Sequence, residues 1–595
     1  MATTSNFCTP QNDRFYSKKP YGGLDRLKKE IRLIRVLQDD GSGQIRCELT
    51  RELPLSEAQD KYAALSYCAG SPQNPKPILV RGNESEEFHE FNAFANLELA
   101  IADACEFCKK HRGDEEPLLW VDQVCINQND DRERSHQVGF MRDIYQCARE
   151  VIVCLSTDKS TSLAVDWLLA PDKPELDEMF YDARAGELSV TFQEQVKRSN
   201  IHARTRVLMR TNSYVARKVS LRNNADTIRE DDFVRASMSD NEFYYGWLDV
   251  LTMLGQPWWT RAWIYQEFMV CKNAQFLFGQ SSISWRQLSA ALVPFIEIFQ
   301  SRIPLARYYC SNRARIGAAT PLVERMTTIL EREISVEDSM TAAKSLLKNK
   351  SSFQIGREIF NTVLAHSRLC RATDPRDLVY AFISLADIAC GIEPDYSHDN
   401  TVHNVFITAA RRAVVCSGNL DILSHAVAVR GDLSLELPSW VPDLTAMESA
   451  VRRDRSLILQ GLSSKKVAPL QTTPRFPISF SEDGRILYAK GSFVVSLERR
   501  MPDGFSPWPP VPLGHLGFEA SGYVIITTDR TATLSDEIWI LDGPRRPFVL
   551  RRSGDHYKLV CMAVVTHTSQ LRDFMDWENV KKAKAPVAWK SISIC

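Results

Sequence analysis

Polar side chains stand at the ends of two short apolar runs, each of the length of a buried strand. The runs and their polar residues are Ala63–Tyr67 with Ser66, and Leu118–Val121 followed by Asp122, Asn127 and Gln128. Ligands of an open parallel sheet bind at the carboxyl ends of its strands. These side chains could therefore line one binding crevice. The alternative is loop and cap chemistry, in which Asp and Asn oxygens accept from backbone amides at a helix start.

A further carboxylate lies much later in the chain. Glu267 follows Trp263 by four residues in a predicted helix from about Arg261 to Cys271, which places both on one helix face. A carboxylate beside an indole combines a negative charge with a wall on which a flat ring can stack. The alternatives are that the Glu267 carboxylate interacts favourably with the helix dipole or pairs with Arg261, and that Trp263 packs in the core.

The common catalytic signatures are missing from this sequence. It has no GxxxxGK[ST] loop, no HExxH, no GxSxG elbow and no Cys/His grouping with zinc spacing. Cys105 and Cys108 form one C-x-x-C inside a helical pattern without a second pair, and Cys125 has no evident base beside it. We expect no metal and no bound cofactor.

The charge balance excludes some classes of protein. There are 73 Lys and Arg against 74 Asp and Glu, a net charge of −1, whereas nucleic-acid and anionic-membrane binders need a positive surplus. The first twenty residues lack the apolar stretch of a secretion signal, and no apolar run approaches the roughly 20 residues of a membrane span. We expect a cytoplasmic protein with no membrane span, no nucleic-acid partner and reduced cysteines.

Strands and helices alternate between residues 61 and 156, the pattern of βαβ units and a parallel sheet. The predicted helices there are Phe91–Cys108 and Arg132–Arg149, and the predicted strands, including two outside this stretch, are Glu30–Leu37, Ala63–Tyr67, Leu118–Val121, Val151–Leu155 and Ala274–Phe278. The predicted domains are a polar N-terminal arm (1–28), an α/β domain (29–290) interrupted by an insertion (157–245), a helical region (291–445) and a small β-rich C-terminal unit (446–595).

Three segments resemble, in order, the signature blocks of the fungal heterokaryon-incompatibility (HET) domain. They are Tyr62-Ala-Ala-Leu-Ser-Tyr-Cys-Ala-Gly70, Leu119-Trp-Val-Asp-Gln-Val-Cys-Ile-Asn-Gln128 and Pro257-Trp-Trp-Thr-Arg-Ala-Trp-Ile-Tyr-Gln-Glu267. The resemblance implies a distant likeness to Toll/interleukin-receptor-like (TIR) domains, and hence a flavodoxin-like parallel sheet. It also implies a role in non-self recognition and programmed cell death after hyphal fusion, through an incompatibility partner protein and self-association.

The TIR likeness implies a chemistry as well. Trp263 and Glu267 have the spacing of the TIR helix that carries the NAD-cleaving glutamate in enzymatic members, so NAD becomes a candidate substrate with Glu267 as the catalytic residue. Ser66, Asp122, Asn127, Gln128 and Trp263 would bind the substrate. The sequence departs from the family at Ala69, where the first block usually has tryptophan. Two alternatives stay open: a non-enzymatic, self-associating adaptor, and an accessory or tailoring protein of a fungal secondary-metabolite pathway.

Overall fold

The computed structural model describes most of the chain in two compact units, Met1–Phe353 and Gln354–Cys595. The described residues are 12–38, 41–70, 74–82, 85–94, 96–156, 164–165, 168, 241–279, 281–299, 328–329, 336–350, 367, 369–383, 385, 391–420, 422–426, 437–445, 474–502, 516–527, 531–544, 547–567 and 588–595. Most of the predicted 157–245 insertion lies outside them.

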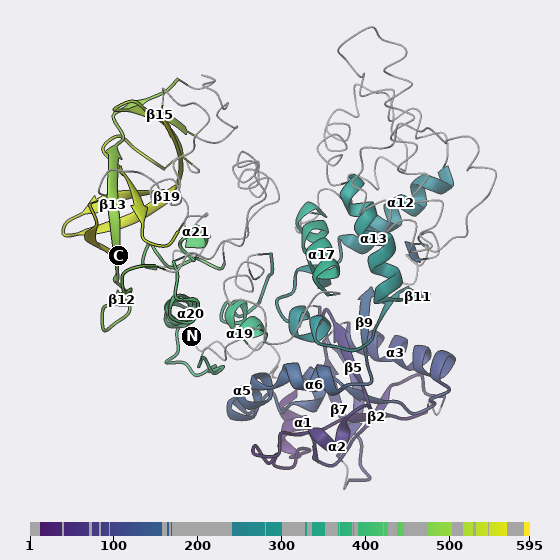
Figure 1. The fold of residues 1–595 in the computed structure, drawn as a ribbon. Coiled ribbons are helices and arrows are strands. Elements are labelled where there is room, and N and C mark those ends of the chain that lie inside the picture. Colours follow the sequence, from purple (N-terminus) through teal and green to yellow (C-terminus); the bar gives the residue numbers. More distant parts are fainter. Residues whose placement is uncertain are drawn as a thin grey trace. The chain divides into compact units, whose positions relative to one another are not determined.

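The first unit is built on a mixed nine-stranded sheet with the order β11-β10-β9-β5-β8-β2-β3-β6-β7 (Figure 1). Its strands are β2 (Ile34–Val36), β3 (Arg46–Leu49), β5 (Ala63–Tyr67), β6 (Lys76–Arg81), β7 (His89–Ala93), β8 (Leu118–Trp120), β9 (Glu150–Ser156), β10 (Ala274–Phe278) and β11 (Ser281–Ser284). A separate two-stranded ladder joins β1 (Glu30–Ile31) to β4 (Leu53–Pro54).

Four neighbouring strands, β10, β9, β5 and β8, run parallel, as the alternation of strands and helices predicts. Every residue of β5 is buried, which fits a central strand covered on both faces. The strands that flank this core are mixed, because β2 joins β8 and β11 joins β10 in the antiparallel sense. The expected parallel sheet is therefore one part of a mixed sheet, in which β3 and β6 form a further parallel pair.

The first unit also contains short and long helices. They are α1 (Asp13–Ser17), α2 (Leu55–Ala58), α3 (Leu97–Arg112), α4 (Asp122–Cys125), α5 (Asp131–Gly139), α6 (Met141–Cys147), α12 (Asn241–Leu254), the 3-10 turn η3 (Pro257–Thr260), the π-helical turn η4 (Tyr265–Met269), α13 (Trp285–Phe299) and α17 (Val336–Lys350). Helix α3 packs on β5, β6 and β9, while α6 approaches the sheet from the other side (Figure 1).

Three predicted helices differ from the observed elements. The first part of Phe91–Cys108 is the edge strand β7, and the helix α3 begins only at Leu97. The helix predicted over Arg132–Arg149 is broken at Phe140, whose backbone has φ −125°. The helix expected from Arg261 is reduced to the wide turn η4. In each case apolar spacing alone does not reveal where the backbone leaves α-helical geometry.

The second unit combines helices with a β-rich sheet. The helices are α19 (Asp377–Ile383), α20 (Val402–Ser417) and α21 (Leu423–Ala426), and the strands are β12 (Ser479–Phe480), β13 (Leu487–Ser496), β14 (Arg499–Arg500), β15 (Leu516–Ala520), β16 (Tyr523–Thr527), β17 (Glu537–Leu541), β18 (Phe548–Ser553), β19 (His556–His567) and β20 (Lys590–Ile594). The ladders are antiparallel apart from one residue pair between β19 and β20. Trp440 is fully buried in this unit, and its indole donates to the Arg485 oxygen at 2.9 Å.

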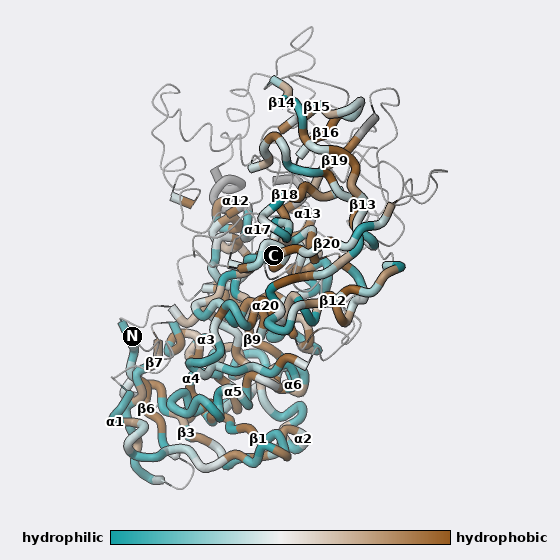
Figure 2. The backbone as a smooth tube through the Cα atoms, turned by 90° about the vertical axis from the view of Figure 1, so that its left-hand side faces the viewer, coloured by the Kyte–Doolittle hydropathy of each residue, from teal (hydrophilic) through white to brown (hydrophobic). Residues whose placement is uncertain are grey.

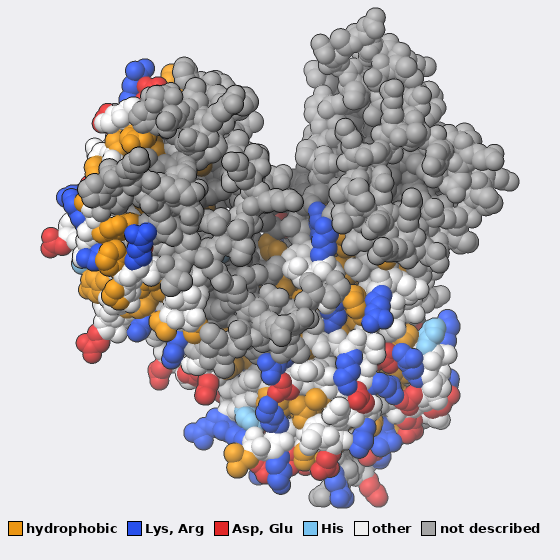
Figure 3. All heavy atoms as spheres, in the orientation of Figure 1, with side chains coloured by type: hydrophobic (Ala, Val, Ile, Leu, Met, Phe, Trp, Pro, Cys, Tyr) orange, Lys and Arg blue, Asp and Glu red, His pale blue; other side chains and the backbone are white. Residues whose placement is uncertain are grey.

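Hydropathy follows these elements: hydrophobic residues run along strands such as β6, whereas α5 is hydrophilic (Figure 2). On the face seen in Figure 3, the lysines and arginines of the first unit are interspersed with aspartates and glutamates. No helix in the described part of the chain combines the length and apolar character needed to span a bilayer.

Candidate functional site

Ser66 lies in the otherwise hydrophobic strand β5, and it is 1% exposed. Its Oγ donates a hydrogen bond to a carboxylate oxygen of Glu267. The same Oγ accepts from the indole nitrogen of Trp258 at 2.8 Å. The structure thus joins the first and third motif segments through one buried serine.

The turns η3 and η4 bring the third segment over the end of β5. Trp258 is fully buried, with its ring edge-on to Phe268 and Phe276. Arg261, between the two turns, donates to the main-chain oxygen of Tyr67. Its guanidinium also lies 3.6 Å from Glu267. π-Helical turns are rare and often occur at functional sites, where they redirect a side chain.

Asp122 begins α4 at the carboxyl end of β8, half-buried. The Tyr67 hydroxyl donates to Asp122 Oδ1 at 2.9 Å, and the Gln123 amide donates to the same oxygen at 2.7 Å. Tyr67 therefore links the second motif segment to the other two. We name Ser66, Tyr67, Asp122, Arg261 and Glu267 the carboxylate cluster.

The electrostatics of the carboxylate cluster are governed by burial. Burial raises the pKa of Glu267, against the opposing effects of Arg261 and the Ser66 hydrogen bond. Burial likewise raises the pKa of Asp122, although Arg261 and Tyr67 stabilise its charged form. Burial alone would lower the pKa of Arg261, but Glu267 and other neighbours raise it, so Arg261 stays charged. Two acids thus share one permanent cation, with their protons bound more tightly than usual.

The remaining predicted site residues have mainly local roles in this structure. Asn127 Oδ1 accepts from the Asn129 amide at 3.1 Å, as in an Asx turn. Gln128 is 5% exposed, and its side-chain amide donates to the main-chain oxygen of Asp122 at 2.8 Å. Trp263 is half-buried, and its main-chain oxygen accepts from the Glu267 amide at 3.1 Å. Asn127 and Gln128 shape the loop after Asp122, as the alternative of loop chemistry describes.

Two members of the cluster were not expected from the sequence as site residues. Tyr67 follows Ser66, and an aromatic residue there reads as core. Arg261 was expected only as a neighbour of Glu267, whereas it also bonds the end of β5. The signal that could have identified both residues is a polar group inside an otherwise buried motif: a hydroxyl at Tyr67 and a guanidinium at Arg261.

No cysteine is a member of the carboxylate cluster. The Cys125 sulfur accepts from the Val121 amide at 3.3 Å, and burial raises its pKa to about 12, which disfavours a nucleophilic role. Burial also raises the pKa of Cys105 to about 12 and that of Cys108 to about 11. Among the described residues, no group of three or more His, Cys, Asp or Glu could hold a metal ion.

The cluster can place a carboxylate, a hydroxyl and a cation together at the end of the parallel strands. Residues 62–267 match the family model described as "Heterokaryon incompatibility protein (HET)". The chain carries a HET domain. The family resemblance of the three motif segments is thereby confirmed, and every member of the carboxylate cluster lies within the matched range.

One curated relative shares sequence beyond the HET domain. It is "Heterokaryon incompatibility protein 6, OR allele" from Neurospora crassa, 26% identical over an alignment of 401 residues that covers 64% of this chain. The chain spans about half of that relative's length, 53%. No solved structure matches the chain significantly.

Proposed function

We propose that this protein acts in fungal heterokaryon incompatibility, inducing death of the fused cell after it meets an incompatible partner protein. The support is the HET match over residues 62–267 and the likeness to an incompatibility protein of Neurospora crassa. The protein works in the cytoplasm, and the HET domain acts by self-association.

The proposal extends to a TIR-like HET domain that cleaves NAD. The order of the parallel strands, β8-β5-β9-β10, supports it, because numbering them along the chain gives 2-1-3-4, the order of flavodoxin-like sheets. In such sheets ligands bind at the carboxyl ends of the strands. The carboxylate cluster occupies that end of β5 and β8.

The observation that carries the proposed chemistry is the contact between Ser66 and Glu267. It sets the carboxylate of the third motif at the end of the central strand, where a bound ribose would lie. Glu267, as the catalytic residue, stabilises the oxocarbenium-like state of the ribose as the bond to nicotinamide breaks. Ser66, Asp122, Asn127, Gln128 and Trp263 bind the substrate.

The reaction is a hydrolysis. The N-glycosidic bond breaks with its electron pair leaving on nicotinamide, and water forms the new bond to the ribose carbon. ADP-ribose, nicotinamide and one proton are the products. Because Glu267 is 1% exposed, η4 or the side chains over it must move before the ribose reaches the carboxylate.

The test is NAD consumption by the purified full-length protein, compared with Glu267→Gln and with Glu150→Gln as a control. Glu150 is also a buried carboxylate paired with an arginine, but it starts β9 and lies outside the cluster. We expect nicotinamide release by the wild type and by Glu150→Gln, and a loss of at least about 100-fold in Glu267→Gln. No release by a folded wild type, with or without a crowding agent that promotes assembly, would remove the hydrolase.

The existing contacts of the Glu267 carboxylate favour a second candidate function, a non-enzymatic adaptor that acts by self-association. Its carboxylate already holds Ser66 and Arg261, and buried networks of this kind also serve to fix a fold. Cell killing on expression in a fungal host separates the two. Killing that persists in Glu267→Gln supports the adaptor, and killing that is lost with NAD consumption supports the hydrolase.

A further inference from the structure

Arg32, between β1 and β2, is a buried cation outside the carboxylate cluster, and it is 1% exposed. Its guanidinium donates to both carboxylate oxygens of Glu133, at 2.7 and 3.0 Å, and its Nε lies 3.3 Å from Glu52. It also donates to the main-chain oxygen of Cys125 at 3.2 Å. A buried charge persists only where it is paired and fully hydrogen-bonded, so this geometry is tightly specified.

Two partners of Arg32, Cys125 in α4 and Glu133 in α5, hold the segment that follows β8. Cys125 ends α4, and Glu133 Oε1 accepts from the Asn127 amide at 2.7 Å. Arg32 therefore holds the segment 122–128 at Cys125 directly and at Asn127 through Glu133. This segment supplies Asp122, Asn127 and Gln128, three of the proposed substrate-binding residues.

The chain before Arg32 reaches the same segment. We name residues 12–22 the N-terminal strap. At one end, Asn12 is fully buried and exchanges hydrogen bonds of 3.1 and 2.7 Å with the backbone of Asn92 on β7. At the other end, the Tyr21 hydroxyl donates to the Val124 oxygen of α4 at 2.9 Å, and its ring lies 4.9 Å from the Arg32 guanidinium.

Arg32, Tyr21 and Asn12 all precede residue 62, where the family match begins. We propose that Arg32 is a positioning residue for the segment 122–128, and that the N-terminal strap completes this support through Tyr21. The working unit of the protein then includes residues 12–61 as well as the HET domain. The link to substrate rests on the proposed NAD cleavage, but the link to the geometry of 122–128 does not.

Two measurements on full-length variants test the proposal: hydrogen–deuterium exchange of peptides covering 121–128 and 150–156, and the KM and kcat for NAD. In Arg32→Met we expect the amides of 121–128 to exchange at least ~10-fold faster, since their anchors are lost. KM for NAD should rise about 10-fold with kcat changed less than about twofold, because Glu267 is not moved. Tyr21→Phe, which removes one hydroxyl, should shift both quantities in the same direction by about threefold.

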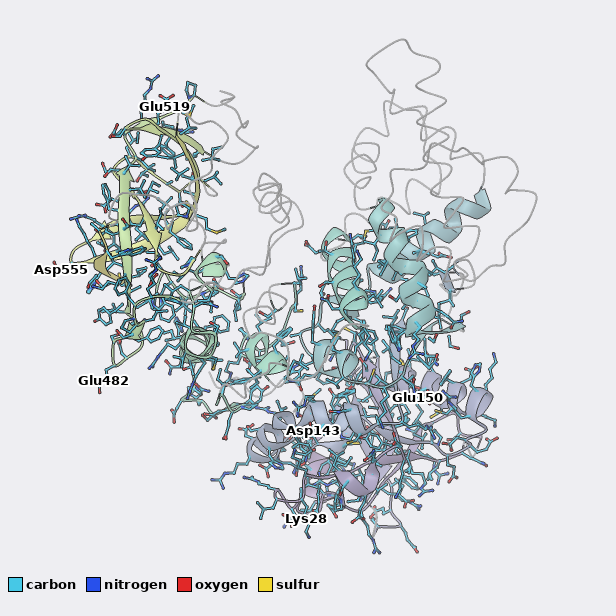
Figure 4. All side chains as sticks on the ribbon, in the orientation of Figure 1. Lys28, Asp143, Glu150, Glu482, Glu519 and Asp555 are labelled. Atoms are coloured by element: carbon cyan, nitrogen blue, oxygen red, sulfur yellow. The ribbon has the colours of Figure 1, made fainter. Side chains whose placement is uncertain are left out.

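The matched control is Arg112→Met. Arg112 also pairs with a buried glutamate through two nitrogens, at 3.1 and 2.6 Å from Glu150. Figure 4 shows Glu150 well apart from Lys28, which lies just beyond the N-terminal strap. This variant should leave exchange in 121–128 and KM unchanged.

Faster exchange spread equally over 121–128 and 150–156 would make Arg32 a general structural residue and overturn the proposal, as would unchanged exchange in 121–128. If Arg32→Met does not fold, Tyr21→Phe decides by the same readouts. A wild type that does not consume NAD would remove the hydrolase, while the exchange measurement would still decide whether Arg32 and Tyr21 position the segment.

Discussion

Lys350 donates a hydrogen bond to the main-chain oxygen of Phe268 at 2.6 Å, and Phe268 directly follows Glu267. The same Nζ lies 3.0 Å from the Met269 oxygen and 2.5 Å from the Cys271 oxygen. The last carbonyls of a helical turn have no partner within the turn, and a cation is well suited to satisfy them. A lysine on α17 thus caps the π-helical turn that carries Glu267.

We expect Lys350→Met to destabilise the protein by about 2–3 kcal/mol, because it leaves buried carbonyls without a donor. Lys348→Met, an exposed position on the same helix, should change stability by less than about 0.5 kcal/mol. The free energy of unfolding in urea measures both. Equal effects in the two variants would show that the cap does not stabilise η4.

Trp258→Phe should cost about 1–3 kcal/mol, since it trims a fully buried ring and removes the donor to Ser66. Phe276→Leu, in the same aromatic group, removes packing but keeps that donor. Urea unfolding should show similar losses for both. NAD consumption should fall further in Trp258→Phe, and an equal fall in the two would assign Trp258 to packing alone.

The pH dependence of stability should reveal the buried state of Glu267. Burial raises its pKa above the ordinary value of 4.5, so the folded protein binds a proton more tightly than the unfolded chain does. A raised carboxyl pKa costs stability as the pH rises from the unfolded towards the folded pKa. Compared with Glu267→Gln, the wild type should therefore lose free energy of unfolding as the pH rises above 4.5.

Asp143→Asn serves as a control of opposite sign. Burial acts to raise the pKa of Asp143, but the hydrogen bonds from Lys29 and Arg142 outweigh burial. The pKa of Asp143 therefore lies below its ordinary value of 3.8. Its contribution is present above that value and is lost as the pH falls through the folded pKa. Unfolding curves in urea between about pH 3 and pH 7 should give the two trends. Parallel curves for wild type and Glu267→Gln would contradict the first.

Thiol labelling should separate buried from accessible cysteines. Burial raises the pKa of Cys125 to about 12, so iodoacetamide at about pH 8 should leave it unmodified in the native protein. Among the described cysteines, Cys68, Cys416 and Cys595 are half-buried and should be labelled before Cys125. Peptide mass spectrometry gives the order. Rapid modification of Cys125 would show that the loop after β8 opens in solution.

The central strands were predictable because a short, continuous apolar run is typical of a strand that is buried on both faces. Ala63–Tyr67 and Ala274–Phe278 are strands with the predicted bounds. Among the flanking strands, β2 lies within the predicted strand Glu30–Leu37, whereas β6 and β7 were not predicted because their evidence is not local. Lys76–Arg81 is polar at both ends, and His89–Ala93 fits a helical pattern as well as a strand, so their pairing partners decide the outcome.

The candidate site was also predictable only in part. That Asp122 lies beside the end of β5 follows from parallel strands sharing one edge. Nothing in the local sequence assigns Arg32 to Glu133, because 101 residues separate them and an arginine in a strand pattern usually faces solvent. The cap on η4 likewise depends on α17, which joins the turn only in the folded unit.

The pairing of β2 with β8 has a consequence for biosynthesis. Ile34 pairs with Leu119, so the edge of β2 that meets β8 stays open until that later strand has left the ribosome. The hairpin of β2 and β3 can form early through Ile34 and Leu49. Its unpaired edge is a surface that joins other strands, and chaperones shield such nascent edges from aggregation. Synonymous codon changes that slow translation before residue 119 would lengthen that exposure and lower the soluble yield.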